Sequence, residues 1–245
     1  MKGTRPLDNN EIRQVSECFD GIYQIRNRSL FLIGVSTGGR ISELLSLCIG
    51  DVYQNGSPVR DMLFDKSIVK GKEHSRAVPV NSDGRAAISD VVKWHRKTYK
   101  SIAKQRPLFP SRNGQGNTKM SRRAAHDVLK KAFELTGLNG KLATHSMRKS
   151  FAQRLYDRTG DIYAVQEMLG HKNITTTQKY LGVNYQNVRA AVEAMAISSE
   201  LHIRDILGSS LKTFSDEKLF LELATRGYDL TSLEKDKIQR ITRTA

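Results

Sequence analysis

The sequence predicts an α+β fold that is mainly helical and contains a small antiparallel sheet of three strands. Most apolar residues recur at the three- and four-residue spacing of helices that bury one face. Between Asp51 and Val80 this spacing is replaced by short apolar runs near the turn signal Asn55-Gly56, and such runs are typical of β-strands. At 245 residues the chain is long enough for one large domain or two modest ones.

Three helices are expected before the strands. Asp8 and Glu11 form a capping-box pattern ahead of an apolar periodic segment, which marks the start of the first helix. A more apolar second helix is expected over residues 22–36. A third is expected over 40–48, after a glycine-containing break at 37–39.

The later elements follow the same two patterns. Short strands are expected at residues 52–53, 62–64, 68–69 and 77–80. Helices are then expected at residues 86–103, 121–135, 144–158, 161–169 and 177–181. Further helical patterns, which indicate an organised C-terminal segment, occupy residues 188–197, 200–207, 215–226 and those from 231 onward.

The composition excludes several classes of protein. No apolar run approaches the 18 residues of a membrane span, and the start of the chain has no apolar segment of the signal-peptide type. We therefore expect a cytoplasmic protein without a membrane partner. Cys18 and Cys48 are expected to be buried small apolar residues in a reducing compartment. No His or Cys cluster has the spacing of metal ligands, so we expect neither a metal nor a cofactor.

The charge distribution indicates a polyanionic partner. The net charge is +15, yet residues 181–245 hold nine basic and nine acidic side chains, so the excess belongs to residues 1–180. Residues 93–131 carry twelve basic side chains against the single acid Asp127. A solvated basic face is the alternative, but such faces usually mix the two signs. A groove that follows a nucleic-acid backbone is therefore favoured.

Two local motifs supply cations that could bind a phosphate. In TGGRISELL the glycines allow a tight turn at a helix entrance, from which Arg40 can project toward an anion, and Glu43 could hold that guanidinium or buttress the fold. In THSMRKSFA the spacing of His145 and Arg148 puts them on one helical face. There a guanidinium can bind a phosphate while an imidazole lies beside it. Each motif alone is more often an ordinary surface feature.

Tyr180, in LGHKNITTTQKYLG, is a candidate nucleophile that these cations could activate. A tyrosine hydroxyl is a poor nucleophile at neutral pH and becomes useful only where cations and proton acceptors gather around a phosphate. His171 lies nine residues before it. The combination indicates phosphoryl transfer on DNA.

With these residues in place, the chain resembles the tyrosine recombinase family of the phage-integrase and Xer type. The resemblance covers roughly residues 5–185, and the spacings from Arg148 to His171 and from His171 to Tyr180 agree with it. A weaker family element, Leu-Phe-Pro, stands at residues 108–110. The matched positions are Thr37, Gly38, Arg40, Glu43, Leu44, Leu47, Asp51, Val52, His145, Arg148, Leu169, Gly170, His171, Thr177 and Tyr180.

The resemblance implies the tyrosine-recombinase catalytic fold and a site-specific recombinase or integrase. Tyr180 would attack a backbone phosphate of double-stranded DNA, leaving a 3′-phosphotyrosyl bond and a free 5′-hydroxyl without metal or ATP. Arg40 and Arg148 would bind the non-bridging oxygens. His145 would accept the proton of the tyrosine and orient it, and His171 would donate a hydrogen bond to the phosphate.

Two lysines are candidates for the general acid that protonates the leaving 5′-oxygen. In IVKGKEHSRAVPV the resemblance favours Lys70, at the end of a strand, and Lys72 is the alternative. Lys149 stands where the family often has His. Tyr185 is the alternative nucleophile, although its spacing from His171 is less suitable. The other tyrosines of this region, expected to be packing residues, are Tyr156 and Tyr163.

Other functions with the same residues stay open. A type IB topoisomerase or a hairpin telomere resolvase would use the same chemistry without pairing two sites. A DNA-binding regulator with a decayed site would do no chemistry, but the complete set of residues disfavours it. We expect residues 1–185 to form the catalytic domain without the family's usual N-terminal core-binding domain. Residues 186–245 would form a neutral helical tail that docks on a neighbouring copy. We also expect the chain to associate with further copies of itself on DNA. An accessory DNA-bending protein is a further expected partner.

Overall fold

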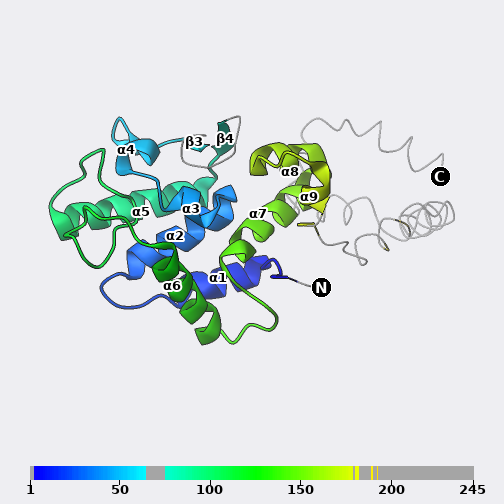
Figure 1. The fold of residues 1–245 in the computed structure, drawn as a ribbon, viewed down its shortest axis with the longest axis horizontal. Helices are drawn as coiled ribbons and strands as arrows, with labels where there is room; N and C mark the ends of the chain where they lie inside the picture. Colours follow the sequence, from blue (N-terminus) through cyan, green and yellow to red (C-terminus); the bar gives the residue numbers. More distant parts are fainter. Residues whose placement is uncertain (1–2, 65–74, 179, 182–188, 190–191, 193–245) are drawn as a thin grey trace, which may run out of the picture. The chain divides into compact units, whose positions relative to one another are not determined.

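The computed structural model describes residues 3–64, 75–178, 180, 181, 189 and 192, and Met1–Gly182 forms a unit of its own (Figure 1). The described part is mainly helical, as predicted, but its strands form two separate antiparallel pairs instead of the predicted single sheet of three strands. No helix in it is long and apolar enough to cross a membrane. The helices are α1 (Asn9–Glu17), α2 (Gln24–Thr37), α3 (Ile41–Leu44), α4 (Ile49–Val52), α5 (Ser82–Tyr99), α6 (Arg122–Leu135), α7 (Thr144–Thr159), α8 (Ile162–Leu169) and α9 (Ile174–Gln178).

Helix α2 lies in the middle of this unit and contacts both α5 and α7 (Figure 1). Its residues Leu30, Phe31 and Ile33 are fully buried, so the helix is apolar around most of its surface. A Cβ on Gly34 would lie 2.7 Å from the sulfur of Met147 on α7. The absence of a side chain at Gly34 therefore lets α7 approach α2 closely.

The N-terminal capping box is confirmed. The Glu11 amide donates to the Asp8 carboxylate at 2.8 Å, and the Asp8 amide donates to Glu11 Oε2 at 2.9 Å. Helices predicted at 121–135, 144–158 and 161–169 are confirmed to within one residue at each end. Helix α5 begins earlier than predicted because Asn81 caps it by accepting from the Gly84 amide.

The described strands form two antiparallel pairs. β1 (Tyr53–Gln54) pairs with β2 (Ser57–Pro58) around Asn55 and Gly56, whose φ angles of 50° and 79° suit the tight turn predicted there. β3 (Asp61–Phe64) pairs with β4 (Arg76–Pro79). The strand predicted at residues 68–69 lies outside the described residues, as do the tail helices except for helical residues Arg189 and Val192.

The third predicted helix is shorter than expected. It ends at Leu44, and α4 then covers Val52, which was predicted to begin a strand. The physical reason is a competing set of hydrogen bonds. Leu47 and Ile49 pair through their backbones with the loop at residues 106–108, and the Asp51 carboxylate accepts from the Cys48 amide at 2.7 Å to start the new helix.

The two cysteines differ from the prediction in their burial. Cys18 and Cys48 are free thiols and only half-buried. They lie at helix boundaries, Cys18 after α1 and Cys48 before α4, instead of inside buried helical faces. Burial still raises the pKa of both thiols.

Candidate active site

The turn between α2 and α3 determines where Arg40 lies. Gly38 ends α2 in the left-handed conformation, with φ 62°, and its amide donates to the Gly34 carbonyl. A Cβ on Gly38 would lie 2.5 Å from the ring of Phe151, so a larger residue would collide there as well as strain the backbone. Arg40 follows in an extended conformation, and its side chain is 29% exposed.

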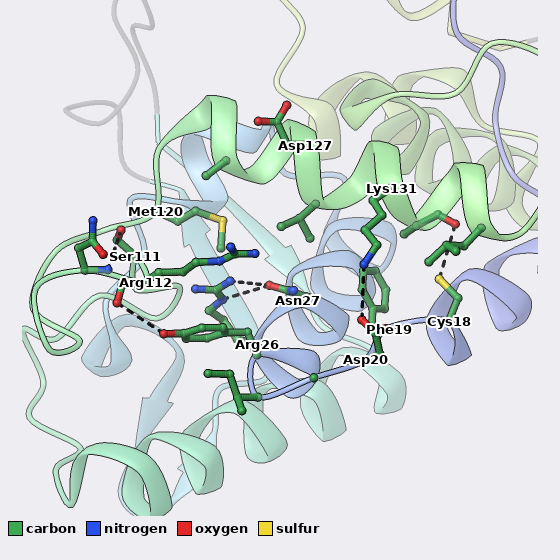
Figure 2. A pocket seen from close by; sticks show the side chains of 18 residues that line it. Cys18, Phe19, Asp20, Arg26, Asn27, Ser111, Arg112, Met120, Asp127 and Lys131 are labelled. Carbon is green, nitrogen blue, oxygen red and sulfur yellow. Dashed lines mark hydrogen bonds and ion pairs between the residues drawn. The ribbon is translucent and has the colours of Figure 1, made fainter.

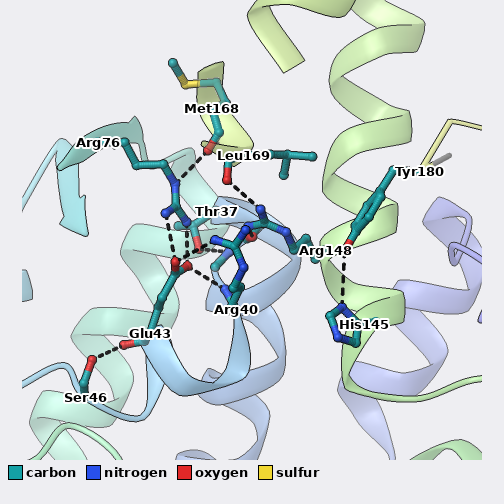
Figure 3. Close-up of polar contacts among 12 residues, drawn as sticks. Thr37, Arg40, Glu43, Ser46, Arg76, His145, Arg148, Met168, Leu169 and Tyr180 are labelled. Atoms are coloured by element: carbon teal, nitrogen blue, oxygen red, sulfur yellow. Dashed lines mark hydrogen bonds and ion pairs between the residues drawn. The ribbon is translucent and has the colours of Figure 1, made fainter. Parts of the chain in front are cut away.

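Glu43 holds Arg40 and a second arginine (Figure 3). Arg40 donates to the carboxylate from its amide at 2.8 Å and from Nη1 at 2.9 Å. Arg76, at the start of β4, donates from Nη1 at 3.0 Å and from Nη2 at 2.6 Å. Burial by itself raises the pKa of Glu43, but the hydrogen bonds and charge of Arg76, joined by those of Arg40, lower this pKa to about 2. The carboxylate therefore stays ionised at neutral pH.

Arg148 lies deeper, on α7. It is 1% exposed and donates to the carbonyls of Gly38 and Leu169. Burial, followed by the charges of Arg40 and Arg76, lowers the pKa of Arg148 to about 9, so it is still a cation at pH 7. Its Nε is buried without a hydrogen-bond partner among the described residues. A buried cation with an unused donor is suited to an anion.

His171 is fixed by the end of α8. Gly170 closes this helix in the left-handed conformation, and Gln166 donates from its side chain to the His171 carbonyl. The imidazole Nδ1 lies 3.0 Å from the hydroxyl of Thr177. The ring is 8% exposed and meets the ring of Tyr180 edge to face, with 4.9 Å between centroids.

The Tyr180 hydroxyl faces the imidazole of His145. Its oxygen lies 3.5 Å from Nδ1 of His145. The guanidinium of Arg148 lies 6.0 Å from the centre of the tyrosine ring, and the ammonium of Lys149 lies 5.7 Å from it. The apolar side of the ring packs against a small core separate from the main one, formed by Ala152, Val165 and Leu169.

The environment of His145 favours the neutral imidazole. Partial desolvation lowers the pKa of His145, and the positive charges of Arg148, Arg40 and Lys149 lower it further. The ring is thus predominantly uncharged at neutral pH, although it is reachable from solvent. A neutral imidazole can accept the proton that a tyrosine loses.

The structure brings together most of the residues predicted for the site. These are Arg40, Glu43, His145, Arg148, His171 and Tyr180. The candidate general acids Lys70 and Lys72, and the alternative nucleophile Tyr185, lie outside the described residues. Tyr156 packs against the small core, as predicted. The prediction for Tyr163 is wrong, because that residue is 72% exposed.

Arg76 belongs to the site but was not predicted. Side chains along a β-strand point alternately to its two faces, so Arg76 lies on the same face as the buried Val78 and Val80. This spacing is the feature of the sequence that could have indicated Arg76. A charged residue that faces inward on a strand needs a buried partner of opposite charge. Sequence reasoning could have found it by asking where that partner was.

Lys149 is tied to the N-terminal segment. Its ammonium donates to the Thr4 carbonyl at 2.6 Å, and the Leu7 amide donates to the hydroxyl of Ser150, one residue further along α7. Arg5 continues the contact by pairing its amide with the Lys141 carbonyl. The segment at residues 4–7 therefore lies along the start of α7, which carries His145 and Arg148.

Most basic residues of the stretch 93–131 are exposed, and they lie on α5, on α6 and on the connection between these helices. Arg106 is the exception, since it is half-buried and donates to the Gln115 carbonyl within the connecting loop. The exposed basic residues are Lys93, Arg96, Lys97, Lys100, Lys104, Arg112, Lys119, Arg122, Arg123, Lys130 and Lys131.

A cavity of about 750 Å³ lies apart from these catalytic candidates, between the α1–α2 connection, α6 and the loop at residues 111–113 (Figure 2). Arg26 lines it, 1% exposed, and donates to the Asn27 side chain and to the Pro110 carbonyl. Burial lowers the pKa of Arg26 to about 10. Its contacts tie α2 to the Leu-Phe-Pro element, which is a structural role.

No group of three or more His, Cys, Asp or Glu suited to a metal occurs among the described residues.

Comparisons with known proteins show which proteins this chain is similar to. The model of the phage integrase family matches residues 5–187. The tyrosine recombinase XerD of Corynebacterium glutamicum is 33% identical over 166 residues, which are 67% of this chain and 51% of that protein. XerD of Mycobacterium leprae is 35% identical over 69% of this chain and 52% of its own length. The chain thus spans about half the length of these curated relatives.

Solved structures show the same fold. A crystal structure of the XerH site-specific recombinase bound to a palindromic difH substrate has a TM-score of 0.61 with 26% identity, covering 78% of this chain and 53% of that one. The XerA recombinase gives a TM-score of 0.62 with 19% identity, over 78% and 66% of the two chains.

Proposed function

Because the chain belongs to the phage integrase family of tyrosine recombinases, we propose that it cleaves and rejoins double-stranded DNA at specific sites through Tyr180. The contact that carries this proposal joins the Tyr180 hydroxyl to Nδ1 of His145 at 3.5 Å, beside the buried cation Arg148. A hydroxyl nucleophile, a proton acceptor and a phosphate-binding cation thus lie within one small region.

The proposed reaction exchanges one ester for another. Tyr180 Oη forms a bond to phosphorus, and the bond from phosphorus to the 5′-oxygen of the next nucleotide breaks. The phenolic proton passes to His145, and the leaving 5′-oxygen takes up a proton. The product is a 3′-phosphotyrosyl ester with a free 5′-hydroxyl, and attack by another 5′-hydroxyl reverses these steps. Oxidants, reductants and nucleotide cofactors have no part in this balance.

The arginines supply the electrostatic part. In the transition state the non-bridging oxygens carry more negative charge than in the substrate, so fixed donors aimed at them lower the barrier. Arg148 Nε has no hydrogen-bond partner in the described part of the chain, and Arg40 is partly exposed while Glu43 binds one side of its guanidinium. Each such donor typically contributes about 3–4 kcal/mol.

The histidines have different parts in the proposal. His145 is neutral enough to accept the proton, since neighbouring cations lower its pKa. His171 is fixed by Thr177 through Nδ1 and packs against the nucleophile ring, so we assign it a hydrogen bond to the phosphate.

Lys70 is the proposed general acid, with Lys72 as the alternative, on the resemblance to the family alone. Substrates with sulfur in place of the bridging 5′-oxygen discriminate between them, because a thiolate leaves without being protonated. The lysine that acts as the acid is the one whose replacement by alanine slows cleavage of the oxygen substrate and leaves cleavage of the sulfur substrate nearly unchanged.

The proposed partners are DNA and further copies of the chain. The exposed basic residues on α5 and α6 favour a phosphate backbone. XerH was solved with its DNA substrate, and a lambda integrase was solved as a dimer on a core site. We extend both properties to this chain as proposals. To these we add an accessory DNA-bending protein, a cytoplasmic location, a catalytic domain over residues 1–185 and a docking tail over 186–245.

The decisive experiment is the formation of a covalent adduct. The full chain is incubated in EDTA with nicked or 5′-phosphorothiolate DNA and resolved on a denaturing gel. The wild type and Tyr156→Phe should form the adduct, and Tyr180→Phe should not. An adduct that survives in Tyr180→Phe would contradict the assignment, and its absence from the wild type would favour a DNA-binding regulator. Strand exchange between two sites then separates a recombinase from a topoisomerase or telomere resolvase.

A further inference from the structure

Among the described cations beside the site, Arg76 makes the most side-chain hydrogen bonds. Its side chain is 8% exposed, and its guanidinium stacks on the Phe64 ring, 4.4 Å from the ring centre. Two of its nitrogens donate to Glu43, and Nε donates to the Met168 carbonyl at 3.0 Å. Arg76 therefore contacts α3, β3 and the end of α8, and Figure 3 shows its bonds to Glu43 and to Met168.

The bonds to Glu43 control the freedom of Arg40. Each carboxylate oxygen accepts one bond from Arg76 and one from Arg40, and the guanidinium of Arg40 uses only its Nη1 for this purpose. Arg76 occupies the carboxylate in the two-pronged geometry that arginine prefers. Arg40 is thereby limited to a one-sided contact, which leaves its other donors for a ligand.

The bond to the Met168 carbonyl connects Arg76 indirectly with Arg148. Met168 and Leu169 are consecutive at the end of α8, and the Leu169 carbonyl accepts from Arg148. The same turn continues through Gly170 to His171. One guanidinium thus fixes the start of β4 against the segment that supports Arg148 and His171.

The charge balance does not fit a purely structural ion pair. Among the described residues, the three arginines Arg40, Arg76 and Arg148 surround the carboxylate of Glu43, so these four groups together carry two excess positive charges. A buried cluster built only for stability gains nothing from unbalanced charge. An anion that enters the site would restore the balance.

We infer that Arg76 is a positioning residue of the reaction, which keeps the guanidinium of Arg40 turned toward the scissile phosphate by holding the Glu43 carboxylate. Without Arg76, Arg40 can turn to make the two-pronged contact with Glu43 and withdraw from the phosphate. This inference rests on the proposed function. It concerns the rate of the chemical step and leaves DNA binding nearly unchanged, because Arg76 itself is buried.

The test measures single-turnover adduct formation at saturating nicked DNA, with DNA affinity measured separately. Arg76→Met should lower the rate constant about 100-fold, the usual loss for one misplaced donor. Its dissociation constant should stay within about threefold of the wild type. The matched control is Arg60→Met, which removes an exposed charge beside the same strands and should change both values less than about threefold. Arg76→Lys should restore part of the rate, because an ammonium keeps the charge but not the two-pronged geometry.

A double-mutant cycle identifies the route of the effect. If Arg76 acts through Glu43, then Arg76→Met combined with Glu43→Gln should be hardly slower than Glu43→Gln alone. Rate losses that multiply, or an Arg76→Met rate equal to that of Arg60→Met, would overturn the inference.

A second readout needs no chemistry and separates this inference from the proposed function. The order of the Arg40 side chain is measured from ¹⁵Nε relaxation in arginine-labelled protein, with Arg40→Lys to assign the signal. Titration with inorganic phosphate is followed on the same signal. Wild type and Arg60→Met should agree, and Arg76→Met should change both the order and the phosphate response of Arg40. An unchanged Arg40 signal would refute the positioning role even if the adduct forms. A changed signal would support it even if Tyr180 formed no adduct.

Discussion

The two sides of the site differ in how deeply their side chains are buried and how many hydrogen bonds hold them. On the arginine side, Arg148 and Glu43 are each 1% exposed, and carbonyl or carboxylate oxygens fix every guanidinium. On the nucleophile side, the Tyr180 hydroxyl is exposed and makes one long contact of 3.5 Å with His145, which is also exposed. The proposed phosphate-binding part is preorganised in the chain by itself, whereas we expect the final geometry of the proposed nucleophile to depend on what binds there.

This difference has a physical origin. Three cations can be kept close together only where bonds to oxygen offset their repulsion, so the arginine side must be rigid. A tyrosine needs only an apolar support for its ring and an acceptor for its proton. The small core beneath Tyr180, with Ala152, Val165 and Leu169, provides that support.

The largest effect is expected from the rigid side. Arg148→Met should reduce single-turnover cleavage about 1,000-fold, because a buried donor to the transition state is lost. It also leaves the Gly38 and Leu169 carbonyls unpaired, at a cost of about 1–3 kcal/mol each in the free energy of unfolding. Arg158→Met, an exposed position on the same helix, is the control for both measurements. Equal cleavage by the two variants would mean that the buried arginine has no catalytic part.

The next effect tests the nucleophile side through pH. The wild-type cleavage rate should fall as pH decreases below the ordinary histidine pKa of 6.5 and through the lowered pKa of His145, because the protonated ring cannot accept a proton. The same lowered value means that the neutral ring contributes stability above pH 6.5, and this contribution is lost at lower pH.

His145→Gln should be about 100-fold slower at neutral pH, and its rate should be flat over that range. The measurement is the pH profile of adduct formation, with DNA binding checked at each pH. A profile of His145→Gln that keeps the wild-type acid limb would assign the proton to another group.

A smaller effect concerns the turn that supports the arginine side. Gly38→Ala should lower the free energy of unfolding by about 2 kcal/mol more than Gly21→Ala, as measured in urea. Both glycines have positive φ, but a Cβ meets Phe151 only at Gly38, and nothing lies within 4 Å of one at Gly21. If the two variants are equally stable, the close contact with Phe151 does not restrict this position.

The smallest effect is expected at Lys149. Lys149→Met removes the cation 5.7 Å from the Tyr180 ring and its bond to Thr4, and should slow cleavage about five-fold. Lys141→Met removes an exposed charge just before the same helix and should have no effect beyond DNA binding. A Lys149→Met variant as fast as Lys141→Met would show that Tyr180 needs no cation at this edge.

Local patterns sufficed for much of the architecture. The capping box at Asp8 and Glu11, the turn at Asn55-Gly56 and the helices over α6, α7 and α8 are all decided by neighbours in the sequence, so they could be predicted. The segment at residues 40–53 could not be, because its backbone pairs with the loop at 106–108, more than fifty residues away. Tyr163 was wrongly predicted to be a packing residue, because the local sequence does not show which face of α8 stays exposed.

The sequence by itself determined the candidate site residues and their spacing, because the family pattern consists of particular residue types at particular intervals. Only the tertiary structure decided how these residues divide the work. It buried Arg148 with one donor that has no partner among the described residues, put Arg76 opposite Glu43 and left Tyr180 half-exposed against His145. Burial and long-range pairing set the charge and orientation of each group, and both depend on how helices and strands pack together, which no single stretch of sequence specifies.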